Sequence, residues 1–390
     1  MSNPVFLLGG GLNGLAVARS LGRYSVPVYL FGAKPDDIAC RSRYVTTVDY
    51  SDSIDHSRLI EQLGKTAQTF RQKPALFYIS DKFLEMCSDH RNELDEYFCV
   101  NLPSAASVHT VINKGEFGHF CVKQNLPAPN SWAPESQADI EQCSNQARFP
   151  VVIKPRFSHG TAQKEFKDNG TFAKMVLVSE PDELKQYYSA FIDIGIRLIV
   201  QEYIDGPDNE HYSYCSYRTS SSKELVGFGF RKLRIHPIHG GVGTFAEVYN
   251  EPDLVGPARE VLDKLQFKGV SSVCFKRDIR TGQLMLHEVN GRFPMGHSAG
   301  LLCGVDVPYV AYLDITGASV STNLLQRTAG QGKWILLGTD MNSFRAYRAA
   351  NEISVWQWLK SLLQVRRCAE FASDDLRPFN FFMISLISRA

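Results

Sequence analysis

The chain has 390 residues, and its 42 basic and 41 acidic side chains nearly cancel, which excludes the global positive field that draws a protein onto nucleic acid or an anionic membrane. Its nine cysteines have no short paired spacing, which argues against a disulfide framework or a zinc ribbon and predicts reduced, cytoplasmic thiols. No stretch approaches the ~18 apolar residues of a membrane span, and the N-terminus lacks the basic flank of a signal peptide.

The first hundred residues alternate between strand and helix patterns. The expected strands are Val5–Leu8, Val26–Phe31 and Pro74–Ile79, and the expected helices are Leu12–Leu21 and Leu59–Phe70. Such alternation predicts a parallel sheet in a Rossmann-like domain over residues 1–100.

Directly after the first strand, the segment Gly9–Gly14 has the pattern G-x-G-x-x-G. Glycines at this spacing permit a tight turn and bring a phosphate close to a helix N-terminus. A ribose-binding acid is expected at the end of the second strand, but Phe31-Gly32-Ala33 stands there, and Asp36 and Asp37 come only in the following loop. The departure favours a structural turn, with an NAD(P)-dependent oxidoreductase as the alternative.

A new domain is expected to begin near Asn101, where Leu102-Pro103 opens a different pattern. Residues 108–126 are expected to be helical, and the strand Pro150–Pro155, a polar loop and a second strand around Lys174–Val178 would form a hairpin. Further strands are expected at Leu198–Tyr203, Tyr212–Tyr217, Leu225–Phe230, Val270–Phe275 and Leu284–Val289. The predicted subdomains are residues 101–195 and 196–325.

A small, mostly helical C-terminal region is expected over residues 326–390. Trp356–Val365 has the pattern of an amphipathic helix, and the apolar stretch Phe379–Ile387 follows it. Packing or oligomerisation, for example as a homodimer, is a better interpretation of these segments than membrane docking.

Four segments in this order resemble the ATP-grasp ligases: Asn113-Lys114, Val152–Pro155, Gln201–Gly206 and Glu288–Arg292. The segments Gly227–Arg234, Pro237–Thr244 and Phe275–Asp278 resemble more narrowly the carbamoyl-phosphate-synthase-like and D-aspartate-ligase-like carboligases. The resemblance implies an α/β Rossmann-like domain followed by an α+β fold of two subdomains that clasp ATP.

Several residues are expected to bind the nucleotide. Lys154 ends an apolar strand immediately before Pro155, so a rigid element would hold its charge against phosphates. The hairpin loop could close over the triphosphate through backbone N–H groups and hydroxyls. The resemblance further implies that Glu202, Tyr203 and Ile204 bind adenine and that Glu210 contacts ribose. The complete set is Lys114, Lys154, Ser158, Gly160, Lys174, Glu202, Tyr203, Ile204 and Glu210.

The strongest local signal is the metal site. Glu288 and Asn290 alternate on one strand face and place two hard oxygen donors about 7 Å apart, a spacing suited to Mg²⁺, or Mn²⁺, that bridges phosphates. Members of this family usually have a glutamate just before the Phe-Lys pair, where this chain has Cys274, so Asp278 is the candidate for the second metal ligand. Thiolate is a poor magnesium ligand, which leaves a catalytically impaired ATP-binding regulatory protein as an alternative.

Three cations are expected to take part in catalysis: Lys154, Arg292 and Arg231. Arg292 follows Asn290 on the same strand face and could stabilise the transferred phosphate. Arg231 belongs to a basic stripe ahead of the Gly240–Thr244 loop, which could clamp an anionic substrate, although a solvated charged strand would look alike.

These residues predict an ATP-dependent ligase that joins a carboxylate to an amine or another nucleophile through an acyl phosphate and releases ADP and phosphate. Positioning and electrostatics do most of the work in such a reaction. The expected substrates are small molecules: an amino acid, a peptide or a sugar acid as the carboxylate, and an amine that completes a C–N bond.

Overall fold

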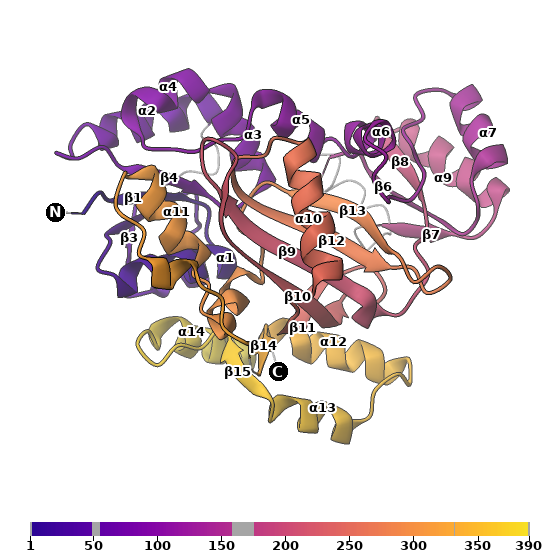
Figure 1. Ribbon diagram of the computed structural model, residues 1–390. Helices are drawn as coiled ribbons and strands as arrows, with labels where there is room; N and C mark the ends of the chain where they lie inside the picture. The colour runs from indigo at the N-terminus through magenta and orange to yellow at the C-terminus, as the bar shows by residue number, and fades with distance from the viewer. Residues whose placement is uncertain (1, 49–54, 158–174, 331, 389–390) are drawn as a thin grey trace.

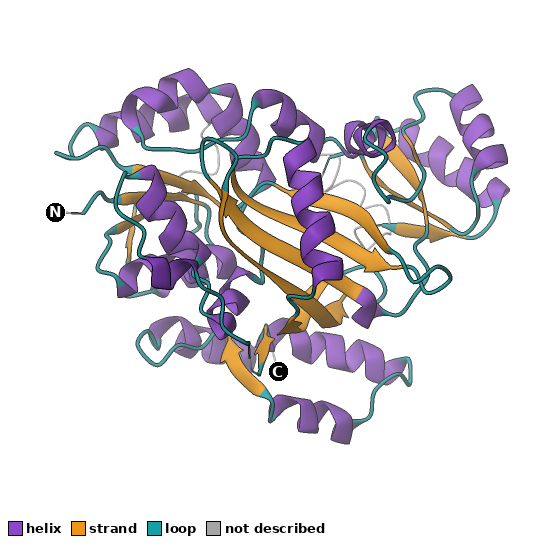
Figure 2. Ribbon diagram, viewed as in Figure 1, coloured by secondary structure: helices purple, strands orange, loops and turns teal. Residues whose placement is uncertain are grey.

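The computed structural model describes residues 2–48, 55–157, 175–330 and 332–388. Within these residues, an N-terminal sheet and a small sheet lie on opposite sides of a large, strongly twisted sheet (Figures 1 and 2). In the described part of the chain, no single helix is long and apolar enough to cross a membrane. Only the pair His297–Cys303 and Val307–Ile315, bent by 99°, meets the requirement of length and composition.

The N-terminal sheet has the order β3-β2-β1-β4, and its strands are all parallel, as predicted. Its elements are β1 (Val5–Leu8), α1 (Gly11–Arg23), β2 (Val28–Phe31), η1 (Ile38–Arg41), β3 (Val45–Thr47), α2 (His56–Ala67), β4 (Ala75–Tyr78), α3 (Asp81–Asp89) and α4 (Arg91–Tyr97). Every residue of β1 is fully buried, because helices cover both faces of a parallel sheet. This explains the unbroken apolar run.

The glycine turn, Gly9–Gly14, is closed by a carboxylate of the same chain. Both oxygens of Asp37 lie 2.8 Å from the backbone N of Gly11 and accept its N–H. A Cβ on Gly10 would lie 2.4 Å from the same carboxylate. Asp37 therefore takes the place that a pyrophosphate takes in dinucleotide-binding turns, and the oxidoreductase alternative loses its one supporting motif.

The small sheet is antiparallel, with the order β5-β8-β6-β7. Its elements and the helices beside it are α5 (Ala105–Ile112), α6 (Lys114–Lys123), β5 (Ser131–Trp132), α7 (Gln137–Gln146), β6 (Val151–Pro155), β7 (Val176–Val178), α9 (Pro181–Ile192) and β8 (Leu198–Glu202). The helix predicted over residues 108–126 is wrong as a single element. Asn113 breaks it, because its side chain accepts from Gly115 N and Glu116 N and so caps α6. Because β8 pairs with β6, this sheet continues to Glu202, past the boundary predicted at residue 195.

The large sheet has the order β13-β12-β9-β10-β11-β14-β15. Its first five strands and neighbouring helices are η2 (Asp208–Glu210), β9 (His211–Arg218), β10 (Glu224–His236), β11 (Val242–Val248), α10 (Pro252–Lys264), β12 (Gly269–Arg277), β13 (Leu284–Asn290), η3 (His297–Cys303), α11 (Val307–Ile315) and η4 (Thr322–Leu325). Strand β10 is longer than predicted and includes the basic stripe. Most of the predicted Gly240–Thr244 loop is the start of β11, because residues 242–248 pair with the far end of β10.

The C-terminal region adds strands as well as the predicted helices. Its elements are β14 (Lys333–Ile335), α12 (Leu337–Ala349), α13 (Val355–Leu362), β15 (Val365–Cys368) and α14 (Arg377–Ile387). Two buried ion pairs anchor it. Arg234 of β10 donates to both oxygens of Asp340, at 2.9 and 2.8 Å, and Arg19 of α1 donates to Asp375 at 3.0 Å. These bonds attach the region to the large sheet and to the N-terminal unit, which consists of the N-terminal sheet and helices α1 to α4.

Candidate active site

A cavity of about 560 Å³ lies between the small sheet and the large sheet, and the N-terminal unit closes one side of it. Its volume is in the range of ligand-binding pockets. Eight of the predicted site residues line this cavity: Lys114, Lys154, Glu202, Tyr203, Ile204, Glu288, Asn290 and Arg292. Three others, Ser158, Gly160 and Lys174, fall outside the residues that the structure describes.

Glu288, Asn290 and Arg292 form a hydrogen-bonded row at the end of β13. Asn290 Nδ2 donates to Glu288 Oε1 at 3.1 Å, and Arg292 Nη2 donates to Asn290 Oδ1 at 3.0 Å. Arg292 Nε donates to Asp81 Oδ1 of the N-terminal unit at 2.9 Å. Alternation along the strand turns all three side chains toward the cavity, and their mutual bonds fix the orientation of each.

The glycine inside this row allows the N-terminal unit to approach. A Cβ on Gly291 would lie 2.7 Å from Leu84 Cδ2 and 3.1 Å from the Phe267 ring. The next aromatic residue, Phe293, packs against Phe77 of β4 with ring centroids 5.3 Å apart. The segment that follows β13 is thus packed against Phe267 and against the N-terminal unit, which holds Arg292 in place.

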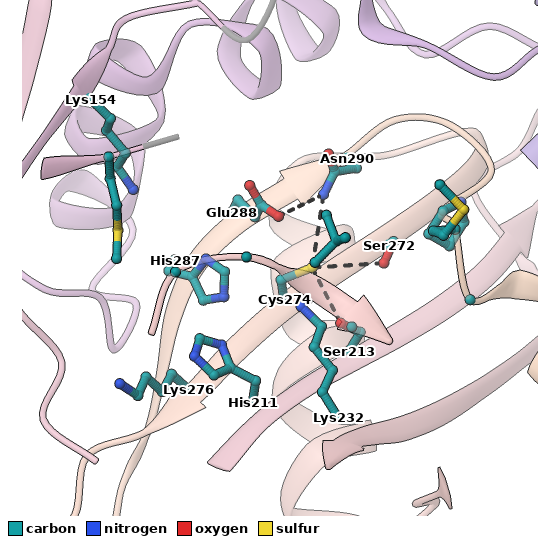
Figure 3. Close-up of a pocket in the computed structure, with 18 of the residues that line it drawn as sticks. Lys154, His211, Ser213, Lys232, Ser272, Cys274, Lys276, His287, Glu288 and Asn290 are labelled. Atoms are coloured by element: carbon teal, nitrogen blue, oxygen red, sulfur yellow. Dashed lines mark hydrogen bonds between the residues drawn. The ribbon is translucent and has the colours of Figure 1, made fainter. Parts of the chain in front are cut away.

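Cys274 stands directly opposite Glu288 in the β12–β13 register. Its sulfur lies 3.4 Å from Ser213 Oγ, and 3.8 Å from both Ser272 Oγ and Asn290 Nδ2 (Figure 3). Burial, followed by the charge of Glu288, raises the pKa of the thiol, so Cys274 is neutral and adds no charge beside Glu288.

The donor set is sparse for a metal ion. Among the described residues, no group of three or more His, Cys, Asp or Glu side chains is arranged to hold one. Glu288 and Asn290 nevertheless supply two hard oxygen donors at the cavity wall. This fits Mg²⁺, which commonly uses one or two carboxylates and takes its other ligands from phosphates and water.

Two lysines reach the cavity from the small-sheet side. Lys154 Nζ donates to Gln201 Oε1 at 2.8 Å, and Lys114 Nζ donates to the carbonyl of Pro155 at 3.2 Å. Burial lowers the pKa of Lys154, while the charge of Glu288 across the cavity acts in the opposite direction. Figure 3 shows Lys154 on the small-sheet side and Glu288 with Asn290 on the large-sheet side. An anion bound between them would meet positive charge on one side and a metal-ligating pair on the other.

Polar contacts hold Glu202, the last residue of β8, and Tyr203, which follows it. Glu202 Oε1 accepts from Arg148 N at 3.0 Å, and Arg148 Nη2 lies 3.5 Å from Glu202 Oε2. The hydroxyl of Tyr203 accepts from Lys276 Nζ at 3.3 Å, and the Lys276 ammonium lies 4.6 Å from the centre of the Tyr203 ring. Burial lowers the pKa of Lys276.

Several cavity residues were given no role in the sequence prediction, among them His211, Ser213, Lys276 and His287, and Lys232 was expected only as a member of the basic stripe with Arg231 and Arg234. The His211 and His287 rings meet edge to face with centroids 5.8 Å apart. Burial lowers the pKa of His287 to about 3 and that of His211 well below its usual range, so both imidazoles are neutral. Strand alternation could have indicated His211 and Lys232. Each directly follows a residue that was predicted to bind a ligand, Glu210 and Arg231 respectively, and so lies on the opposite face of the strand.

Glu210 and Arg231 point away from the cavity, which corrects their predicted roles in ribose and substrate binding. Arg231 Nη2 donates to Glu210 Oε1 at 2.8 Å, and Arg231 Nε donates to the carbonyl of Asn209 at 2.6 Å. Because successive residues of a strand face opposite sides, Lys232 enters the cavity when Arg231 does not.

Asp278 also lies outside the cavity lining, which corrects its prediction as the second metal ligand. It follows the last residue of β12, and its carboxylate accepts from the backbone N and the Nε of Arg280, each at 2.9 Å. These hydrogen bonds lower the pKa of Asp278. It lies four positions beyond Cys274, the partner of Glu288, a distance of roughly 13 Å in extended chain.

No family model matches the chain. A D-aspartate ligase of Enterococcus faecium is 23% identical over 299 residues, which cover 73% of this chain and 70% of that protein. The ADP complex of N5-carboxyaminoimidazole synthetase from Staphylococcus aureus superimposes with a TM-score of 0.63 and 14% identity, over 82% of this chain and 79% of that one. An L-amino acid ligase from Bacillus licheniformis gives a TM-score of 0.64 and 13% identity, over 85% and 78%. The chain therefore has the ATP-grasp fold, and its resemblance to ATP-grasp ligases, predicted from its motifs, is confirmed.

Proposed function

We propose that the protein is an ATP-dependent ligase that joins a carboxylate to an amine through an acyl phosphate. The observation that carries the proposal is the bonded row of Glu288, Asn290 and Arg292, which faces Lys154 across the cavity. Metal-ligating oxygens, a guanidinium and a partly buried ammonium around one space are what the transfer of a phosphoryl group requires.

In this proposal the nucleotide spans the cavity from the β8 end toward Arg292. Tyr203 and Ile204 lie beside adenine, and Lys154 with Lys114 binds the phosphates. Glu288 and Asn290 hold Mg²⁺, which when bound neutralises charge on the phosphate oxygens. The bonds from Arg292 to Asp81 and Asn290 fix the guanidinium before substrate arrives, so little reorganisation is needed during the reaction.

The chemistry has two steps. A carboxylate oxygen of the substrate attacks the γ-phosphorus of ATP, the bond from that phosphorus to the β–γ bridging oxygen breaks, and ADP leaves with the electron pair. The amine nitrogen then attacks the acyl carbon, the bond from that carbon to the phosphate oxygen breaks, and the nitrogen loses one proton. Arg292 stabilises the phosphoryl oxygens in both steps. D-aspartate ligase and L-amino acid ligase among the similar proteins support an amino acid as one substrate.

A coupled assay of ADP release tests the proposal across a panel of carboxylates and amines, in the presence of Mg²⁺, with mass measurement of any product. We expect one pair to stimulate ADP release and to yield a product of the summed mass less one water. The test variant is Glu288→Gln, which keeps the side-chain shape and the hydrogen bond from Asn290 but removes the charge. It should lower the rate of ADP release by about 10²–10³-fold. Turnover near the wild-type rate in Glu288→Gln would refute the site assignment.

A second candidate, an ATP-binding regulatory protein without turnover, rests on the neutral Cys274 opposite Glu288. Calorimetric binding of ATP together with no ADP release from any substrate pair would select it. Under the same conditions, Cys274→Glu should restore ADP release if the missing carboxylate alone prevents turnover.

A further inference from the structure

The N-terminal unit contributes a polar side chain to the cavity that the proposed nucleotide and metal contacts leave unused. Asn13 lies in the first turn of α1, within the Gly9–Gly14 segment, and is only 8% exposed. Its Nδ2 donates to the carbonyl of Phe293 at 3.3 Å. Among the described residues its Oδ1 is buried and has no hydrogen-bond partner. Asn13 also lines the cavity, so a molecule in the cavity can reach this residue.

A buried carbonyl oxygen without a donor destabilises the folded protein, and nearly all such groups in folded proteins are satisfied. An amide oxygen only accepts hydrogen bonds. Whatever satisfies Asn13 Oδ1 must therefore present an N–H or an O–H group.

Asn13 is a close neighbour of the reacting groups. The Phe293 carbonyl that accepts from Asn13 also lies 3.5 Å from Arg292 Nη1, so a single oxygen joins the two side chains. Arg292 Nε holds Asp81 Oδ1 on its other side. Asn13 and Asp81 thus both approach Arg292 from the N-terminal unit, Asn13 through the Phe293 carbonyl and Asp81 through the guanidinium itself.

The proposed reaction selects between the two kinds of donor. Of its two substrates only the amine presents N–H groups, since a carboxylate at neutral pH has no hydrogen to donate. Asp81 also lines the cavity, and although Arg292 balances its charge, its carboxylate can accept a further hydrogen bond. Lys82, the next residue, also lines the cavity and supplies a cation for a carboxylate on the same molecule. One amino-acid molecule carries both groups.

We propose that Asn13 and Asp81 form the subsite for the amine of an amino-acid substrate, with Asn13 Oδ1 accepting an N–H bond. This inference rests on the proposed function and deepens it by naming the class of the nucleophile and its place. The amine is held beside Arg292, where the acyl phosphate forms, so its lone pair can be directed at the acyl carbon. The N-terminal unit is then the part of the chain that selects the amine.

The test measures binding rather than turnover, by calorimetry on the full chain saturated with ADP and Mg²⁺. The probes are matched pairs that differ by one amino group: D- and L-aspartate against succinate, D- and L-alanine against propionate, and D- and L-glutamate against glutarate. We expect at least one amino acid to bind about tenfold or more tightly than its partner acid, as loss of a charged hydrogen bond predicts.

Asn13→Leu, which has a similar volume and no acceptor, should abolish this preference while ADP affinity stays unchanged. Asp81→Asn should weaken it by about tenfold, and Asn13→Asp, which keeps an acceptor oxygen, should retain it. Asn101→Leu is the control, because the Asn101 side chain donates to Tyr217 and Arg218 outside this cavity, and it should leave the preference unchanged.

Three outcomes overturn the inference: no amino acid in the panel binds, an Asn13→Leu protein keeps the wild-type preference, or Asn101→Leu loses it equally. None of them depends on ADP release. A failure here is therefore distinguishable from a failure of the ligase proposal, which the Glu288→Gln assay decides.

Discussion

The glycine turn of the N-terminal unit and the cavity between the two other sheets both have sequence signals for phosphate binding, but they are built oppositely. In the turn, the Asp37 carboxylate already accepts the N–H of Gly11. In the cavity, Lys154, Lys232 and Arg292 surround open space. A glycine pattern specifies the path of the backbone, whereas anion binding also requires that the donors still face a ligand. The comparison supports the proposal that the phosphates bind in the cavity rather than at the turn.

The largest effect is expected at the cavity lysine that faces Glu288. Lys154→Met keeps the apolar stem and removes the buried charge, so ADP release should fall by about 10²–10³-fold. The assay is the coupled one, with the best substrate pair from the screen. A loss smaller than about threefold would remove Lys154 from the phosphate site.

A pH effect of the next size is expected from His297, which is 2% exposed and whose Nδ1 lies 2.8 Å from the Pro294 carbonyl. Burial lowers its pKa to about 4, below the ordinary value of about 6.5. The stability it contributes is therefore fully present above pH 6.5 and is lost as the pH falls toward 4, at up to about 1.4 kcal/mol per pH unit.

Urea unfolding of the wild type and of His297→Gln at pH 7.5, 6 and 5 measures this slope. Glutamine cannot take up a proton in this range. The unfolding free energy of His297→Gln should therefore fall less steeply with decreasing pH than that of the wild type, by a slope that corresponds to about one bound proton. Equal slopes in the two proteins would show that His297 does not cause the acid sensitivity.

A smaller effect separates two neighbouring cations on β10. Lys232→Met should weaken ATP binding by about tenfold, because Lys232 enters the cavity and a charge-assisted bond has about that worth. Arg231→Met serves as the matched control, since Arg231 is occupied with Glu210 and the Asn209 carbonyl. Calorimetry with ATP should find it within about twofold of the wild type. A larger loss of ATP affinity in Arg231→Met than in Lys232→Met would mean that Arg231, and not Lys232, faces the bound nucleotide.

The smallest effect is expected at the glycine turn. Asp37→Ala removes the acceptor for Gly11 N and for Ala39 N, and should cost about 1 kcal/mol of unfolding free energy, as the loss of a helix cap does. ATP affinity should not change. A weaker affinity for ATP in this variant would place the nucleotide at the turn and reverse the comparison.

The sequence predicted the strands and the orientation of their side chains correctly where the pattern of side chains within a single strand was sufficient. The apolar run Val5–Leu8 and the alternating Glu288, Asn290 and Arg292 could be interpreted without a partner strand. The cavity-facing sides of β9 and β10 could not be identified in this way, because a shift of one residue exchanges the two faces of a strand. Glu210 and Arg231 were therefore predicted in place of their neighbours, His211 and Lys232. The role of Asp278 depended on the register that sets Cys274 opposite Glu288. Asn13 and Asp81 reach the cavity only through packing between units distant in the chain.

The bond from Arg19 to Asp375 has a practical consequence for dissecting the molecule. Arg19 is buried in α1, and besides Asp375 it donates to the carbonyls of Ala369 and Glu370. A shortened chain that stops before residue 365 would leave this guanidinium without its counter-charge, at a cost of roughly 3–5 kcal/mol. It would also strip β15 from the edge of the large sheet. We therefore expect a fragment that contains the candidate site but lacks the segment through α14 to be less stable than the full chain.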